Sequence, residues 1–166
     1  MSARAPALIA VATLCAAAAP SKPTATPFDA RDPASLIVLL ATMDARAEVV
    51  ARGEDTVDLK VATPAYGFAV QYAGCDAQRR ACKAALFTAQ SERTPTLAQI
   101  NAFNQTSITC RAFQDRAGKP HLLYSTLVSS QDSRDEMRAH LGAWQGCLGE
   151  FGAFVADPNG YLAAAP

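Results

Sequence analysis

The segment from Ser133 to Val155 carries one continuous apolar stripe, which constrains the fold more than any other feature of the chain. Its apolar residues recur every three or four positions, the spacing of one face of an α-helix. Ser133 and Glu136 have the spacing of a capping box at the start of that helix. A helix with a single apolar face needs a surface to cover, so the rest of the chain has to supply one. The stripe consists of Met137, Leu141, Trp144, Leu148, Phe151 and Val155.

Short segments with alternating apolar and polar residues predict strands that supply this surface. Val57, Leu59 and Val61 share one face of such a segment, and charged residues occupy the other face. We expect strands at residues 47–51, 57–62, 67–73, 83–90, 107–114 and 121–129, and helices that begin at Asp32-Pro33, after Thr96 (97–104) and after Ser133. The order is helix, four strands, helix, two strands, helix. This order predicts an α+β fold in which helices cover one face of a mostly antiparallel sheet of about six strands.

The N-terminal segment has the pattern of a secretory signal peptide. Arg4 precedes an apolar run that ends in small residues, and Ala16 and Ala18 fit a cleavage site after Ala18. The run is shorter than the roughly 20 residues that cross a bilayer, and we expect no membrane span in the mature chain. We therefore predict a periplasmic or secreted protein. Its parts are a signal peptide (1–18), a flexible leader (19–31), a folded domain (32–156) and a disordered tail (157–166).

The charge balance excludes one broad class of function. The chain has 15 basic and 15 acidic residues, and its pI is near 6.7. A protein that binds nucleic acid through its backbone phosphates needs a basic surface. We therefore expect no nucleic-acid partner.

Several segments together resemble the YbjN family, described as bacterial sensory transduction regulators. The resemblance rests on the Asp-Pro helix start, a strand that ends at Cys75 with a restart at Cys82, and three later segments, residues 100–104, 111–115 and 144–154. It covers residues 32–155, nearly the whole mature chain. The resemblance implies a fold similar to type III secretion chaperones and a regulatory or adaptor role. It implies no catalytic residues.

Four cysteines remain after the signal peptide, and export favours disulfides between them. Cys75 and Cys82 lie at the end of one predicted strand and the start of the next, close enough for a bridge in an antiparallel pair. Cys110 in a strand and Cys147 in the last helix could join the sheet to the helix. Two buried thiols are the alternative for this second pair. A zinc site with His121 or His140 is a further alternative, but neither histidine has metal-like spacing to a second ligand, and we predict no metal.

Asn101 and Asn104 fall beside Leu97 and Ile100, on the predicted buried face of their helix. We expect their side chains to satisfy backbone groups at the turn into the next strand. The functional alternative is a binding site for a peptide or small ligand, formed by Asn101, Asn104 and Arg111.

The sequence contains no nucleophile elbow, phosphate-binding loop, dinucleotide fingerprint or zinc-protease motif. We therefore expect a non-catalytic adaptor or regulator without a cofactor, which binds an unknown protein or peptide in the bacterial envelope. The alternative is a small-molecule binding protein or an enzyme with a pocket between sheet and helices. Gly142, Gly146, Gly149 and Ala153 lie off the apolar stripe. They suggest a helix contact in a homodimer, close packing within the fold, or tolerance of glycine at these positions.

Overall fold

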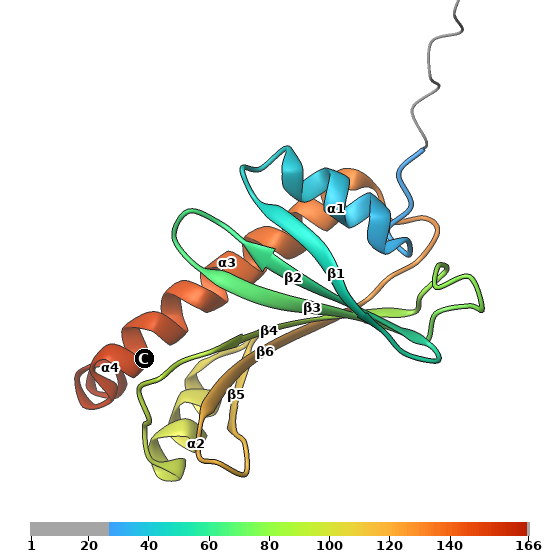
Figure 1. The fold of residues 1–166 in the computed structure, drawn as a ribbon. Helices are drawn as coiled ribbons and strands as arrows, with labels where there is room; N and C mark the ends of the chain where they lie inside the picture. The colour runs from blue at the N-terminus through green and yellow to red at the C-terminus, as the bar shows by residue number, and fades with distance from the viewer. Residues whose placement is uncertain (1–26, 166) are drawn as a thin grey trace, which may run out of the picture.

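The computed structural model describes residues 27–165 as a six-stranded antiparallel sheet with helices on one face (Figure 1). The strand order is β1-β2-β3-β4-β6-β5. This confirms the predicted α+β class and adds a fourth helix. In chain order the elements are α1 (Pro33–Ala41), β1 (Arg46–Arg52), β2 (Thr56–Ala62), β3 (Gly67–Ala73), β4 (Ala84–Gln90), α2 (Leu97–Thr106), β5 (Arg111–Gln114), β6 (Pro120–Leu127), α3 (Arg134–Ala156) and α4 (Pro158–Ala164).

The predicted helix starts are confirmed by their caps. The Asp32 side chain accepts a hydrogen bond from the Ala34 amide at 2.9 Å, and Pro33 occupies the first turn of α1. Thr96 and Ser133 each form a complete capping box, at the starts of α2 and α3. None of the helices between residues 27 and 165 is long and apolar enough to cross a membrane.

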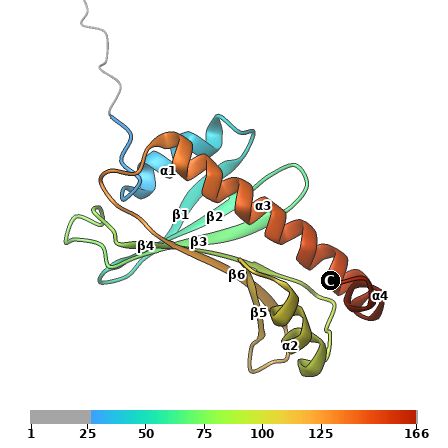
Figure 2. The same ribbon diagram turned by 180° about the vertical axis from the view of Figure 1, so that it is seen from behind.

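Helix α3 lies across one face of the sheet (Figure 2). The core lies between the two, and Trp144 is its largest fully buried side chain. The Trp144 ring is 5.8 Å from that of Phe68 on β3 and 5.9 Å from that of Phe87 on β4, centroid to centroid. The indole Nε1 of Trp144 is buried, and it has no hydrogen-bond partner among the described residues. Apolar packing therefore holds this residue in place.

The buried face of α3 differs from the predicted stripe in its second half. Leu148 and Val155 are only half-buried, and Cys147 and Phe154 take their places in the core. The reason lies in what α3 covers. The first half of α3 lies on the sheet. In the second half, Cys147 forms a disulfide with Cys110, and the Phe154 ring packs on that of Phe103 in α2, with 4.8 Å between their centroids. The buried face therefore turns toward α2.

The prediction of a disordered tail at residues 157–166 is wrong for the part that the structure describes. Asp157 caps α4 by accepting a hydrogen bond from the Gly160 amide at 3.0 Å, and Pro158 begins the helix. Tyr161 then packs against Phe103 and Phe154, with ring centroids 5.9 and 5.8 Å away. These tertiary contacts stabilise a helix that is too short to persist alone.

The prediction of a flexible leader at residues 19–31 is wrong for its last residues. The carbonyl of Ala30 accepts a hydrogen bond from the buried Tyr72 hydroxyl at 3.2 Å, and the carbonyl of Arg31 accepts one from the Cys82 amide at 3.1 Å. These two bonds tie the segment to β3 and to the loop before β4. The predicted signal peptide lies outside the described residues.

The structure places both predicted cysteine pairs at disulfide distance. Cys75 and Cys82 bridge the loop between β3 and β4. Cys110, just before β5, is bonded to Cys147 of α3, with 5.9 Å between their Cα atoms. The second bridge joins the sheet layer to the helix layer.

Candidate functional site

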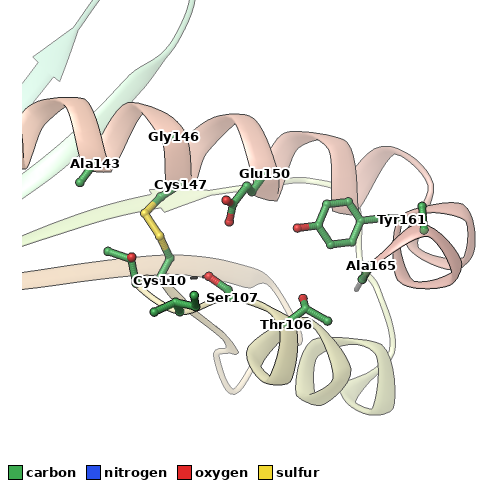
Figure 3. A pocket seen from close by; sticks show the side chains of 12 residues that line it. Thr106, Ser107, Cys110, Ala143, Gly146, Cys147, Glu150, Tyr161 and Ala165 are labelled. Atoms are coloured by element: carbon green, nitrogen blue, oxygen red, sulfur yellow. Dashed lines mark hydrogen bonds between the residues drawn. A yellow bond between two sulfur atoms is a disulfide. The ribbon is translucent and has the colours of Figure 1, made fainter.

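A groove of about 490 Å³ lies between the end of α2, the segment that follows it, and the helices α3 and α4 (Figure 3). We call it the α3–α4 groove. The Cys110–Cys147 disulfide forms part of its wall, and small residues of α3 and α4 keep it open. Its lining is Thr106, Ser107, Ile108, Thr109, Cys110, Ala143, Gly146, Cys147, Glu150, Tyr161, Ala164 and Ala165.

One wall of the groove is a loop where the sequence predicted a strand. The predicted strand 107–114 is wrong in its first half, because only Arg111–Gln114 pairs with β6. The Ser107 hydroxyl accepts a hydrogen bond from the Cys110 amide at 3.3 Å. The Arg111 guanidinium donates to the carbonyls of Ser107 and Cys110, both at 2.7 Å. Local polar bonds thus satisfy backbone groups that a strand ladder would otherwise use.

Asn104 fixes the C-terminal end of the same loop, through hydrogen bonds to the backbone of β5. Its side-chain amide donates to the carbonyl of Ala112 at 2.9 Å and accepts from the Ala112 amide at 2.7 Å. This is the contact with backbone groups that the structural interpretation of Asn104 predicts. Asn101 is exposed, and Leu97 is 63% exposed, so the prediction that both lie on the buried face of α2 is wrong. Only Ile100 and Phe103 of α2 are buried, because the helix covers the sheet edge with a narrow face.

None of Asn101, Asn104 and Arg111 lines the α3–α4 groove. Asn104 and Arg111 instead position the loop 107–110, which does line it. A direct role of the three residues in ligand binding stays a prediction.

We expect the substitution Asn104→Ala to lower the free energy of unfolding by about 2 kcal/mol, because two hydrogen bonds are lost and the Ala112 backbone is left without them. Asn101→Ala is the matched control, since Asn101 is exposed on the same helix, and we expect a change within about 0.5 kcal/mol. Urea unfolding followed by circular dichroism measures both. Equal losses for the two variants would contradict this role of Asn104.

The polar part of the groove centres on Glu150 and Tyr161, which approach it from α3 and α4 (Figure 3). Burial raises the pKa of the Tyr161 phenol and the charge of Glu150 raises it further, whereas a hydrogen bond with Thr106 lowers it. The phenol is therefore protonated at neutral pH and can donate a hydrogen bond. The Glu150 carboxylate forms no ion pair with any described residue, so its charge is available to a ligand.

The apolar part of the groove includes Ile108, a residue that is 94% exposed. From α3, the small residues Ala143 and Gly146 line the groove. A Cβ atom built on Gly142, Gly146 or Gly149 would meet no atom within 4 Å. Close packing among the described residues therefore does not explain these glycines. Two explanations of these glycines remain: the helix tolerates them, or a partner outside this chain packs against them.

The groove offers hydroxyl groups, one carboxylate and exposed apolar surface. The two histidines lie elsewhere. The His140 Nδ1 forms a hydrogen bond with the Tyr124 hydroxyl at 2.6 Å. The His121 ring stacks on that of Phe113, with the ring centroids 5.0 Å apart. Within residues 27–165 no group of three or more His, Cys, Asp or Glu could hold a metal ion. The chemistry that this groove supports is recognition of a positive charge beside an apolar group.

Sequence reasoning missed Ile108, Glu150 and Tyr161. One signal could have found Glu150. It lies three residues after Cys147, on the same side of α3, so the predicted Cys110–Cys147 bridge places it near the loop 107–110. For Tyr161 the available signal was Asp157 before Pro158, the same helix-start pattern as Asp32 before Pro33, but the residues from Asp157 onward were expected to form a disordered tail.

The family model of YbjN, described as "Putative bacterial sensory transduction regulator", matches residues 33–155. The chain belongs to the YbjN family. The match spans α1 to nearly the end of α3, and α4 follows it. No curated protein and no solved structure matches the chain. Membership of YbjN therefore places the chain in a family described as regulators.

Proposed function

We propose that this YbjN protein is a non-catalytic adaptor or regulator of the bacterial envelope that binds a protein partner through the α3–α4 groove. The observation that carries the proposal is an exposed Ile108 close to an unpaired carboxylate, Glu150, in one groove. Ile108 and the small residues that line the groove with it offer apolar surface that a partner can cover. The family description as a regulator agrees with this role.

The groove suggests the chemistry of the bound segment. An apolar side chain would pack on Ile108 and on the small residues Ala143 and Gly146, and a neighbouring Lys or Arg would face Glu150. The Tyr161 hydroxyl and the hydroxyls of the loop can bond to the segment's backbone. We therefore propose a peptide segment with a basic residue beside an apolar one.

Two observations support the envelope as the place of action. Both cysteine pairs are bonded, and disulfides persist in oxidising compartments. The sequence pattern of residues 1–18 supports export independently of the cysteines.

A photo-crosslinking amino acid at Ile108 tests the proposal in cells that make the protein. We expect one reproducible crosslinked partner from position 108. A crosslinker at Leu127 is the matched control, because Leu127 is also highly exposed but ends β6, away from the groove. The partner segment is then synthesised and titrated against the wild type, Glu150→Lys and the charge-matched control Glu54→Lys in the exposed turn before β2.

We expect Glu150→Lys to weaken binding of that segment by roughly tenfold, because an attraction becomes a repulsion, and Glu54→Lys to leave it unchanged. The proposal fails if position 108 crosslinks nothing that position 127 does not. It also fails if the two lysine variants bind alike.

A further inference from the structure

We propose a second binding site, at the end of the molecule opposite α4, for a carboxylate attached to an apolar group. The site is a cavity of about 300 Å³ between the residues before α1, α1 itself, the loop between β3 and β4, and the start of α3. Both views show these segments side by side (Figures 1 and 2). The residues that carry the argument are Phe28, Asp32, Val38, Arg80 and Arg134, all in the cavity wall.

Two arginines of this cavity have no carboxylate partner. Neither Arg80 nor Arg134 forms an ion pair with any residue between 27 and 165. Residues 1–26 contain no Asp or Glu, so their side chains cannot neutralise these two charges either. Two guanidinium groups that line one cavity without an ion-pair partner favour an anionic ligand.

The nearby carboxylates are already engaged elsewhere. Asp29 binds the Arg31 guanidinium at 2.8 Å, and this hydrogen bond lowers the pKa of Asp29. Asp76 accepts hydrogen bonds from the amides of Gln78 at 3.0 Å and Arg80 at 2.8 Å. Asp29 is thus neutralised by Arg31, whereas Asp76 accepts from backbone amides of its own loop, and neither carboxylate forms an ion pair with the Arg80 or Arg134 side chain. The two arginines remain available.

Both guanidinium groups are carried by restrained elements. Arg134 lies over the ring of Phe28, with 5.6 Å from its guanidinium carbon to the ring centroid. Arg80 belongs to the loop that the Cys75–Cys82 disulfide closes. Restraint of this kind reduces the conformational entropy that a ligand would otherwise have to remove on binding.

The charge of the cavity indicates a monoanion. Asp32 also lines the cavity, and its carboxylate accepts the amide hydrogen of Ala34 at 2.9 Å. Two arginines and one aspartate leave one net positive charge, which a carboxylate balances and a dianionic phosphate exceeds. Phe28 and Val38, the latter 59% exposed, supply apolar surface for the rest of the ligand. The carboxylate could belong to a free apolar acid or to the C-terminus of a peptide, and this site is independent of the α3–α4 groove.

Calorimetric titration of the purified protein with two pairs of ligands tests the site. One pair is octanoate and octanamide. The other is a short peptide that ends in leucine, either as the free acid or as the amide. We expect at least one of the two acids to bind, and its uncharged analogue to bind about tenfold more weakly or not at all. The acid that binds more tightly identifies the source of the carboxylate.

Arg80→Gln and Arg134→Gln are each expected to weaken binding of that acid by roughly fivefold or more. Arg116→Gln is the matched control, because it removes the same charge from the exposed turn between β5 and β6. The proposal is overturned if neither acid binds, if acid and amide bind alike, or if Arg116→Gln weakens binding as much as the other two variants.

Discussion

Replacing Cys110 and Cys147 together with alanine should lower the free energy of unfolding by about 4 kcal/mol. The two residues are 37 positions apart, and the entropy that a cross-link removes from the unfolded chain grows with the length of the closed loop. The bridge also joins α3 to the loop 107–110, so its loss loosens one wall of the α3–α4 groove. Denaturant unfolding of the wild type and the double variant, in the absence of reductant, measures the difference.

The other cysteine pair is the natural control for this experiment. Cys75 and Cys82 are only 7 positions apart. The same dependence of unfolded-chain entropy on loop length gives a loss of about 2.5 kcal/mol in the free energy of unfolding when both become alanine. We therefore expect the 110/147 variant to be the less stable of the two. If both double variants lose the same stability, or if the 75/82 variant loses more, the 110–147 bridge is not the more stabilising of the two.

Trp144→Ala should destabilise the protein by about 4 kcal/mol, since the side chain is completely buried and its removal leaves a large cavity. The rings of Phe68 and Phe87 would lose their contacts with it on one side. Because Trp144 is the only tryptophan, its fluorescence disappears with the substitution, and circular dichroism has to follow the unfolding.

Trp144→Phe separates packing from hydrogen bonding at this position, and it stays informative if the alanine variant does not fold. Phenylalanine keeps an aromatic ring between α3 and the sheet and removes an indole N–H that has no partner. We expect a loss below about 2 kcal/mol, because no hydrogen bond is broken and only part of the volume is removed. A phenylalanine variant as unstable as the alanine variant would mean that Nε1 makes a contact essential for folding.

The parts of the fold that the sequence predicted depend on local chemistry. Helix starts followed from short-range caps: Asp32 before Pro33, the hydroxyl of Thr96, and the capping box at Ser133. Strands followed from alternation, because one face of β2 and β3 is buried and the other is open. In both cases residues close in sequence determine the outcome.

The parts that the sequence missed depend on contacts between distant segments. Helix α4 depends on Tyr161 reaching Phe103, 58 residues earlier in the numbering, and nothing in the local pattern indicates that contact. The residues before α1 are held by Tyr72 and Cys82 in the same way. Short segments of low helix or strand propensity cannot be placed without their tertiary partners.

The α3–α4 groove also depends on contacts between segments that are distant in sequence, so no sequence motif predicted it. Its lining comes from the end of α2, the following loop, the middle of α3 and the whole of α4. The sequence did indicate two of its supports, the cysteine pair and the contact between Asn104 and backbone groups. A binding site formed by segments that are distant in sequence is recognised only once the fold is known.

If the α3–α4 groove binds a partner through Ile108 and Glu150, reversing the charge of Glu150 must weaken that binding. The decisive measurement is a titration of the segment that crosslinks at position 108, with the wild type, Glu150→Lys and Glu54→Lys compared under identical conditions. We expect roughly tenfold weaker binding for Glu150→Lys and unchanged binding for Glu54→Lys. Equal affinity of the wild type and both variants would show that the groove does not bind the segment in this way.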